Sequence, residues 1–79
     1  MKEIYQQMNE IFRNELDNPA IELMPETTAH DIPEWDSLSN IQLVVAIEKK
    51  FNIRFTTSEI LTFKNVGEMA GAIARKISA

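Results

Sequence analysis

The chain has 79 residues, which suits a single compact domain, and we expect one domain over residues 1–79. It contains no cysteine, and this excludes a disulfide framework, a thiolate metal site and a thiol nucleophile. The net charge of −4 argues against a nucleic-acid partner, because neutralising phosphates requires clustered lysine and arginine and these residues are scattered here.

The first predicted element is an amphipathic helix over residues 2–16. Its apolar residues recur at steps of three and four, which is the spacing of one helix face. They are Ile4, Met8, Ile11, Phe12 and Leu16. Asp17, Asn18 and Pro19 end this pattern, because Asp and Asn favour turns and proline lacks a backbone donor.

A long connection follows, over residues 19–35. Pro25 and Pro33 forbid an uninterrupted helix here. The segment carries four apolar residues that can pin it onto a helical bundle, namely Ile21, Leu23, Ile32 and Trp35. Connections of this length are usually functional or disordered, and the apolar anchors predict an ordered loop.

A second helix is expected to begin at Asp36 or Ser37, since both residue types are good N-caps, and to end near Lys50 or Phe51. One side of this helix predicts a core face made of Leu43, Val44, Ile47 and Phe51. A second stripe consists of Leu38, Ile41 and Val45, with Glu48 continuing the same line. Either the helix is central and packed from two directions, or the second stripe is a docking patch for another protein.

The rest of the chain predicts one short helix and one longer helix. Thr56 and Glu59 have the spacing of a capping box, and Asn65 and Glu68 have cap-like spacing too. The last helix has one apolar stripe, made of Val66, Met69, Ala70, Ile73 and Ile77, and is weakened slightly by Gly67 and Gly71. No strand pattern is present. The sequence therefore predicts an all-α four-helix bundle, with three main helices, one short helix and a long ordered loop between the first two.

Ser37 lies where the second helix begins, beside the second stripe. Unpaired backbone N–H groups and the positive end of the helix dipole favour an anion at such a place, and a phosphodiester suits it. The plainer interpretation is that Ser37, or Asp36 before it, is only an N-cap. Position in the helix leaves both interpretations open.

The second helix resembles that of acyl carrier proteins. The residues that carry this resemblance are Asp36, Ser37, Leu38, Ile41, Leu43, Ala46, Ile47, Glu48 and Phe51. The apolar loop before them, the segment from Phe55 to Leu61 and the last helix extend the similarity over nearly the whole chain. The family fold is a four-helix bundle with a long first loop, which agrees with the organisation expected from the residue pattern alone.

The resemblance implies a carrier protein and not an enzyme. A phosphopantetheinyl transferase that needs magnesium would attach 4′-phosphopantetheine from coenzyme A to Ser37, and the thiol of that arm would carry an acyl group as a thioester. Asp36 would help to position the transferase and its metal. Leu38, Ile41 and Val45, with Glu48, would form the docking surface for the transferase, for an acyl-loading ligase or transferase and for acyl-consuming enzymes.

This chain also departs from the fatty-acid members of the family. Their second helix has a row of carboxylates, whereas five residues interrupt that row here and leave only Glu48. The five are Ser39, Asn40, Gln42, Lys49 and Lys50. Trp35 stands where fatty-acid carriers commonly have a small residue, and this resembles stand-alone carriers of specialised pathways. As a plainer role, Trp35 anchors the long loop.

Other functions fit less well. A serine hydrolase needs a base near its nucleophile, but the only histidine is His30, which we interpret as a loop residue near the modified serine, and no Gly-x-Ser-x-Gly turn exists. One histidine and dispersed carboxylates match no common metal site. No apolar run approaches the roughly 20 residues of a spanning helix, and the N-terminus lacks a basic segment followed by an apolar stretch, so we expect a cytoplasmic protein without membrane insertion. We also expect a monomer. An aminoacyl or peptidyl carrier and an unmodified helical adaptor remain as alternatives.

Overall fold

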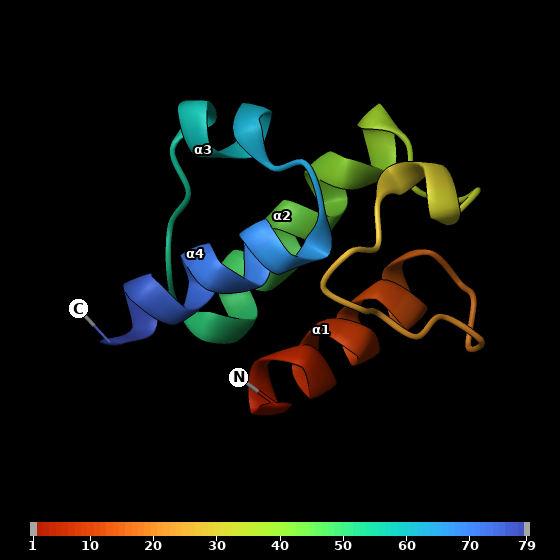
Figure 1. Ribbon diagram of the computed structural model, residues 1–79, viewed down its shortest axis with the longest axis horizontal. Helices are drawn as coiled ribbons and strands as arrows, with labels where there is room; N and C mark the ends of the chain where they lie inside the picture. The colour runs from red at the N-terminus through yellow and green to blue at the C-terminus, as the bar shows by residue number, and fades with distance from the viewer. Residues whose placement is uncertain (1, 79) are drawn as a thin grey trace.

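The computed structural model describes residues 2–78 and places them in helices joined by turns (Figure 1). The helices are α1 (Lys2–Glu15), the 3-10 turn η1 (Ala29–Asp31), α2 (Ser37–Phe51), α3 (Thr57–Thr62) and α4 (Val66–Ser78). No strand occurs within the described residues. The predicted all-α bundle of three main helices and one short helix is therefore confirmed. None of these helices is long and apolar enough to cross a membrane.

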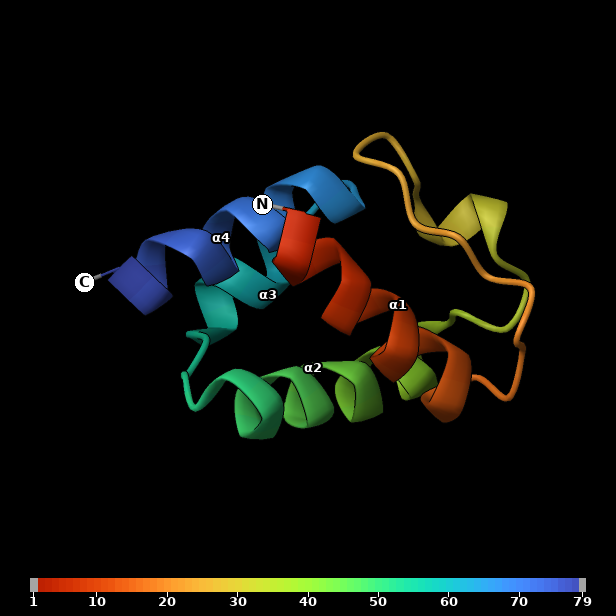
Figure 2. The same cartoon turned by 90° about the horizontal axis from the view of Figure 1, so that it is seen from below.

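The core lies between α1, α2 and α4. Figure 2 shows α1 and α4 on the same side of α2, and α1 contacts both. The largest side chains that are fully buried there are Met8, Phe12, Leu43, Ile47, Val66, Met69 and Ile73. This set confirms the apolar faces expected for all three helices. Burial of apolar side chains on this scale is the main favourable contribution to folding, at about 1.5–3 kcal/mol for each large side chain.

The last apolar residue of α4 departs from the prediction. Ile77 belongs to the predicted apolar stripe of this helix, but its side chain is 50% exposed. Figure 2 shows the final turn of α4 projecting past the other helices, and this agrees with the half exposure of the residue. The periodicity of a helix indicates which residues share a face, and the length of the partner helices decides how many of them are buried.

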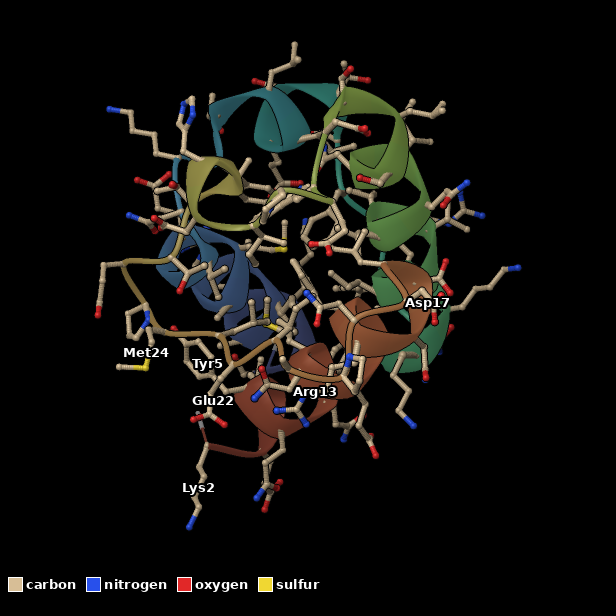
Figure 3. All side chains as sticks on the ribbon, turned by 90° about the vertical axis from the view of Figure 1, so that its right-hand side faces the viewer. Lys2, Tyr5, Arg13, Asp17, Glu22 and Met24 are labelled. Carbon is tan, nitrogen blue, oxygen red and sulfur yellow. The ribbon has the colours of Figure 1, made fainter. Side chains whose placement is uncertain are left out.

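The long loop is ordered because side chains of α1 bind its backbone. The Asn9 Oδ1 atom accepts the backbone N–H of Leu23 at 2.8 Å, and the Arg13 Nε atom donates to the carbonyl of Ile21 at 2.7 Å. Arg13 also approaches Glu22 at 3.7 Å, and Figure 3 labels these two side chains beside each other. Three of the expected apolar anchors, Ile21, Leu23 and Ile32, are buried.

The same loop is also tied to the start of α4. The N–H of Val66 donates to the Thr27 carbonyl, and the N–H of Gly67 donates to the Pro25 carbonyl, both at 2.8 Å. A Cβ atom built on Gly67 would lie only 2.8 Å from the Pro25 oxygen. Gly67 is therefore the residue that lets the loop backbone satisfy the open N–H groups of α4.

The connection between α2 and α3 is held by hydrogen bonds between residues that are close in the sequence. Asn52 ends α2 in the left-handed conformation, with φ of 56°. The Glu48 Oε2 atom accepts the N–H of Phe55 at 2.8 Å. Thr56 and Glu59 form the expected capping box, and Glu59 also pairs with Lys76 of α4 at 2.9 Å. Since α3 contains no buried residue, these polar contacts hold it in place together with its partly buried side chains.

The two glycines of α4 give a matched test of this packing. We expect Gly67→Ala to lower the free energy of unfolding by about 1–3 kcal/mol, because the new methyl group meets a backbone carbonyl. Gly71→Ala should raise it by about 0.5–1 kcal/mol, because the nearest atom, the Nη1 of Arg75, is 3.9 Å away and alanine is the better helix former. Urea denaturation followed by circular dichroism measures both. If both substitutions changed the free energy of unfolding equally, the close approach of Gly67 to the Pro25 carbonyl would be contradicted.

Candidate functional site

The site is built at the start of α2, where Asp36 is the N-cap. Its backbone is extended, and its Oδ1 atom accepts the N–H of Leu38 at 3.0 Å and the N–H of Ser39 at 2.8 Å. The Ser39 hydroxyl accepts the N–H of Asp36 at 2.9 Å and donates to the carbonyl of Glu34 at 2.9 Å. Asp36 and Ser39 therefore form a reciprocal capping box, and the capping role does not fall to Ser37.

Ser37 is the first residue of α2, and its side chain is exposed. Its hydroxyl makes no hydrogen bond to any other described residue, because the cap is supplied from both sides of it. A serine that only caps a helix accepts a backbone N–H two or three residues ahead. Ser37 does not, so its exposed hydroxyl is not occupied by a capping bond.

Asp36 is exposed and keeps its charge easily. The backbone N–H of Ser39 lowers the pKa of this carboxyl below its ordinary value. Its Oδ2 atom accepts no hydrogen bond from the described residues. Asp36, beside Ser37 as predicted, thus has one carboxylate oxygen that can face a cation. Its negative charge also offsets part of the helix dipole.

A pocket of about 260 Å³ lies beside Ser37, between the start of α2, the end of α3 and the start of α4. Trp35 and Asn40 line one wall, and Ile60 and Phe63 line another. The Trp35 ring meets Phe12 edge to face at 5.0 Å between centroids, which confirms Trp35 as a loop anchor. The sequence gives no signal for this pocket, because it joins residues that are more than 20 positions apart.

The second stripe of α2 faces outward. The exposed fractions are 71% for Leu38, 62% for Ile41 and 42% for Val45. A helix packed from two directions would bury these side chains, so the structure favours the docking interpretation. Glu48 is half-buried, and its carboxylate has a structural role because it accepts the backbone N–H of Phe55. A docking role for Glu48 stays a prediction.

Two other expectations concern the loop and metals. His30 is exposed in η1, within the loop as interpreted from the sequence, and it does not line the pocket beside Ser37. Its place near the modified serine stays a prediction. Among residues 2–78, no three His, Cys, Asp or Glu side chains come together in a way that would hold a metal ion.

Comparisons with known proteins agree on one family. The family model described as the phosphopantetheine attachment site matches residues 6–73. An acyl carrier protein of Acidothermus cellulolyticus is 34% identical over 73 residues, covering 92% of this chain and 87% of that protein. One of a Picosynechococcus species is 31% identical over 78 residues, covering 99% and 96%. The solution structure of holo acyl carrier protein from Geobacter metallireducens has a TM-score of 0.89 and 38% identity, covering 94% of this chain and 85% of that one.

The lowered pKa of Asp36 predicts a contribution to stability that depends on pH. A carboxyl whose pKa is lower in the folded state stabilises the fold above its unfolded pKa, and this stabilisation is lost as the pH falls through its folded pKa. We expect Asp36→Asn, which keeps a cap oxygen but no charge, to lose less stability than the wild type below about pH 4. Thermal unfolding followed by circular dichroism across pH measures this. Asp36→Ala should unfold at a lower temperature at every pH, and identical pH profiles for wild type and Asp36→Asn would refute the assignment.

Proposed function

Since this chain belongs to the acyl carrier protein family, we propose that Ser37 is the residue that carries its phosphopantetheine arm. The chain is a carrier and not an enzyme, and it carries acyl groups on this prosthetic group. When bound, the arm supplies the thiol that forms the thioester, which the protein itself lacks because it has no cysteine.

The free hydroxyl of Ser37 is the observation that carries this assignment. The chain has four serines, and two of them use their hydroxyls internally: Ser39 in the capping box and Ser78 on the carbonyl of Ala74. Ser58 lies on α3, away from the pocket. Only Ser37 combines an exposed hydroxyl without a partner among the described residues with a position at a helix start and beside the pocket.

Attachment needs little from the protein beyond this placement. The Ser37 oxygen forms a phosphodiester with the pantetheine phosphate of coenzyme A, adenosine 3′,5′-bisphosphate leaves, and the hydroxyl proton passes to the transferase. We assign Asp36 a positioning role, in which its unused oxygen faces the magnesium ion that the transferase brings. The exposed start of α2 leaves room for that approach.

The partners follow from the same family. We propose that the second stripe is the surface on which the phosphopantetheinyl transferase, an acyl-loading enzyme and acyl-consuming enzymes dock. Leu38 is adjacent to Ser37, so a protein that contacts this stripe has the attachment residue within reach. We also propose that the protein acts as a monomer in the cytoplasm.

Modification of Ser37 is tested by intact mass. Incubation with coenzyme A, magnesium and a broad-specificity phosphopantetheinyl transferase should add the mass of one phosphopantetheine to the wild type and nothing to Ser37→Ala. Ser58→Ala is the matched control, since it removes another exposed helical serine and should be modified normally. No addition to the wild type, with a transferase shown to be active on another carrier, would favour the unmodified adaptor.

Docking on the second stripe is tested at Ile41. We expect Ile41→Glu to slow modification by the transferase about five- to thirtyfold, because a buried apolar contact of the complex is replaced by a charge. The far-UV circular dichroism spectrum should not change, because the side chain is 62% exposed. Ile41→Leu keeps the apolar surface and should retain the wild-type rate. Unfolding of Ile41→Glu would instead place Ile41 in the core.

A further inference from the structure

A surface groove of about 530 Å³ lies at the end of α2 and shares no lining residue with the pocket beside Ser37. Val45 and Ile53 supply its apolar surface, and Lys49 and Arg54 are its two cations. Val45 also belongs to the second stripe and is 42% exposed, so the groove continues that stripe beyond its last apolar residue.

The groove has a fixed backbone because Glu48 binds the chain that follows α2. The carbonyl of Glu48 accepts the N–H groups of Asn52 and Ile53, the latter at 3.0 Å. Its carboxylate accepts the N–H of Phe55 at 2.8 Å. Ile53 is half-buried and packs against the core. The apolar wall of the groove is therefore held in place without any partner.

The end of α2 is positively charged in a protein that is negative overall. Residues 45–58 contain three cations and one carboxylate, whereas the remainder of the chain contains five cations and eleven carboxylates. The three cations are Lys49, Lys50 and Arg54, which are exposed and form no ion pair within residues 2–78. The one carboxylate, that of Glu48, is half-buried and engaged with the backbone.

The helix itself accounts for only part of this charge. Lys49 and Lys50 lie in the last turn of α2, where a positive charge offsets the negative end of the helix dipole. Arg54 lies after the helix, in the connection to α3, so the dipole gives no reason for it. A guanidinium without an ion pair can bind a carboxylate through two parallel hydrogen bonds.

We propose that this groove is a docking site for an acidic segment of a partner protein. Carboxylates of the segment pair with Lys49 and Arg54, and an apolar side chain of it lies between Val45 and Ile53. The inference rests on the proposed docking surface and adds the charge of the enzyme that uses it. An anionic membrane is a poorer occupant, because the carboxylates of the remainder of the chain would be repelled from it.

The test uses isotope-labelled apo protein and a synthetic helical peptide in which glutamates flank a stripe of leucines. We expect the amide NMR signals of Val45, Lys49, Ile53 and Arg54 to shift on titration. Binding should weaken at least about threefold between about 25 mM and about 300 mM NaCl, because salt screens exposed charges. The same peptide with lysines in place of the glutamates should bind less well, although the net charge of −4 favours it.

Two charge-reversed proteins separate the groove from the total charge. Lys49→Glu with Arg54→Glu should weaken binding of the acidic peptide about tenfold or more, since two attractive pairs become repulsive. Lys64→Glu with Arg75→Glu is the matched control, because it changes the net charge equally at exposed residues outside the groove. It should change the affinity by less than about threefold.

Equal binding of the acidic and basic peptides would overturn the proposal, and so would an equal effect of the two charge-reversed proteins. Binding to phosphatidylglycerol vesicles in place of the acidic peptide would assign the groove to a membrane and overturn it too. The carrier assignment is tested separately, because peptide binding uses the unmodified protein. Failure to modify Ser37 would overturn the attachment, whereas modification of Ser37 without peptide binding would overturn the groove alone.

Discussion

The Asp36 carboxylate fixes the start of α2, and the functional part of the molecule is positioned from that point. By accepting two N–H groups of the first turn, it makes Ser37 the first helical residue and relieves it of any capping task. Ser39 completes the cap from the other side. A free hydroxyl at a helix start is thus a consequence of the residues around Ser37, which make the capping hydrogen bonds themselves.

The long loop contributes to the same site because the chain is small. The described residues form one core, and the loop adds three buried apolar residues to it. Hydrogen bonds to Asn9 and Arg13 fix its first half, and the close approach at Gly67 fixes its middle. Its last residues are therefore held firmly enough for Trp35 to form one wall of the pocket.

Much of this fold could be predicted from the sequence because its signals are local. Helix periodicity and capping boxes depend on residues three or four positions apart, so the helix limits, the core faces and the start of α2 were confirmed. The turn η1, the approach of Gly67 to Pro25 and the bond from Phe55 to Glu48 could not be predicted. The approach of Gly67 to Pro25 depends on how distant segments meet, and so does the exposure of Ile77. The capping box of η1 and the bond from Phe55 to Glu48 are local, but each is a single contact and leaves no repeating pattern in the sequence.

The geometry of α2 explains how one residue can serve two surfaces. At about 100° per residue, Asn40 lies about 60° to one side of Ser37, and the second stripe lies about 40–100° to the other side. A group attached at Ser37 would therefore stand between the pocket and the second stripe. Glu48 is the only carboxylate of α2 and is engaged with Phe55, so the second stripe offers apolar side chains and not a row of charges.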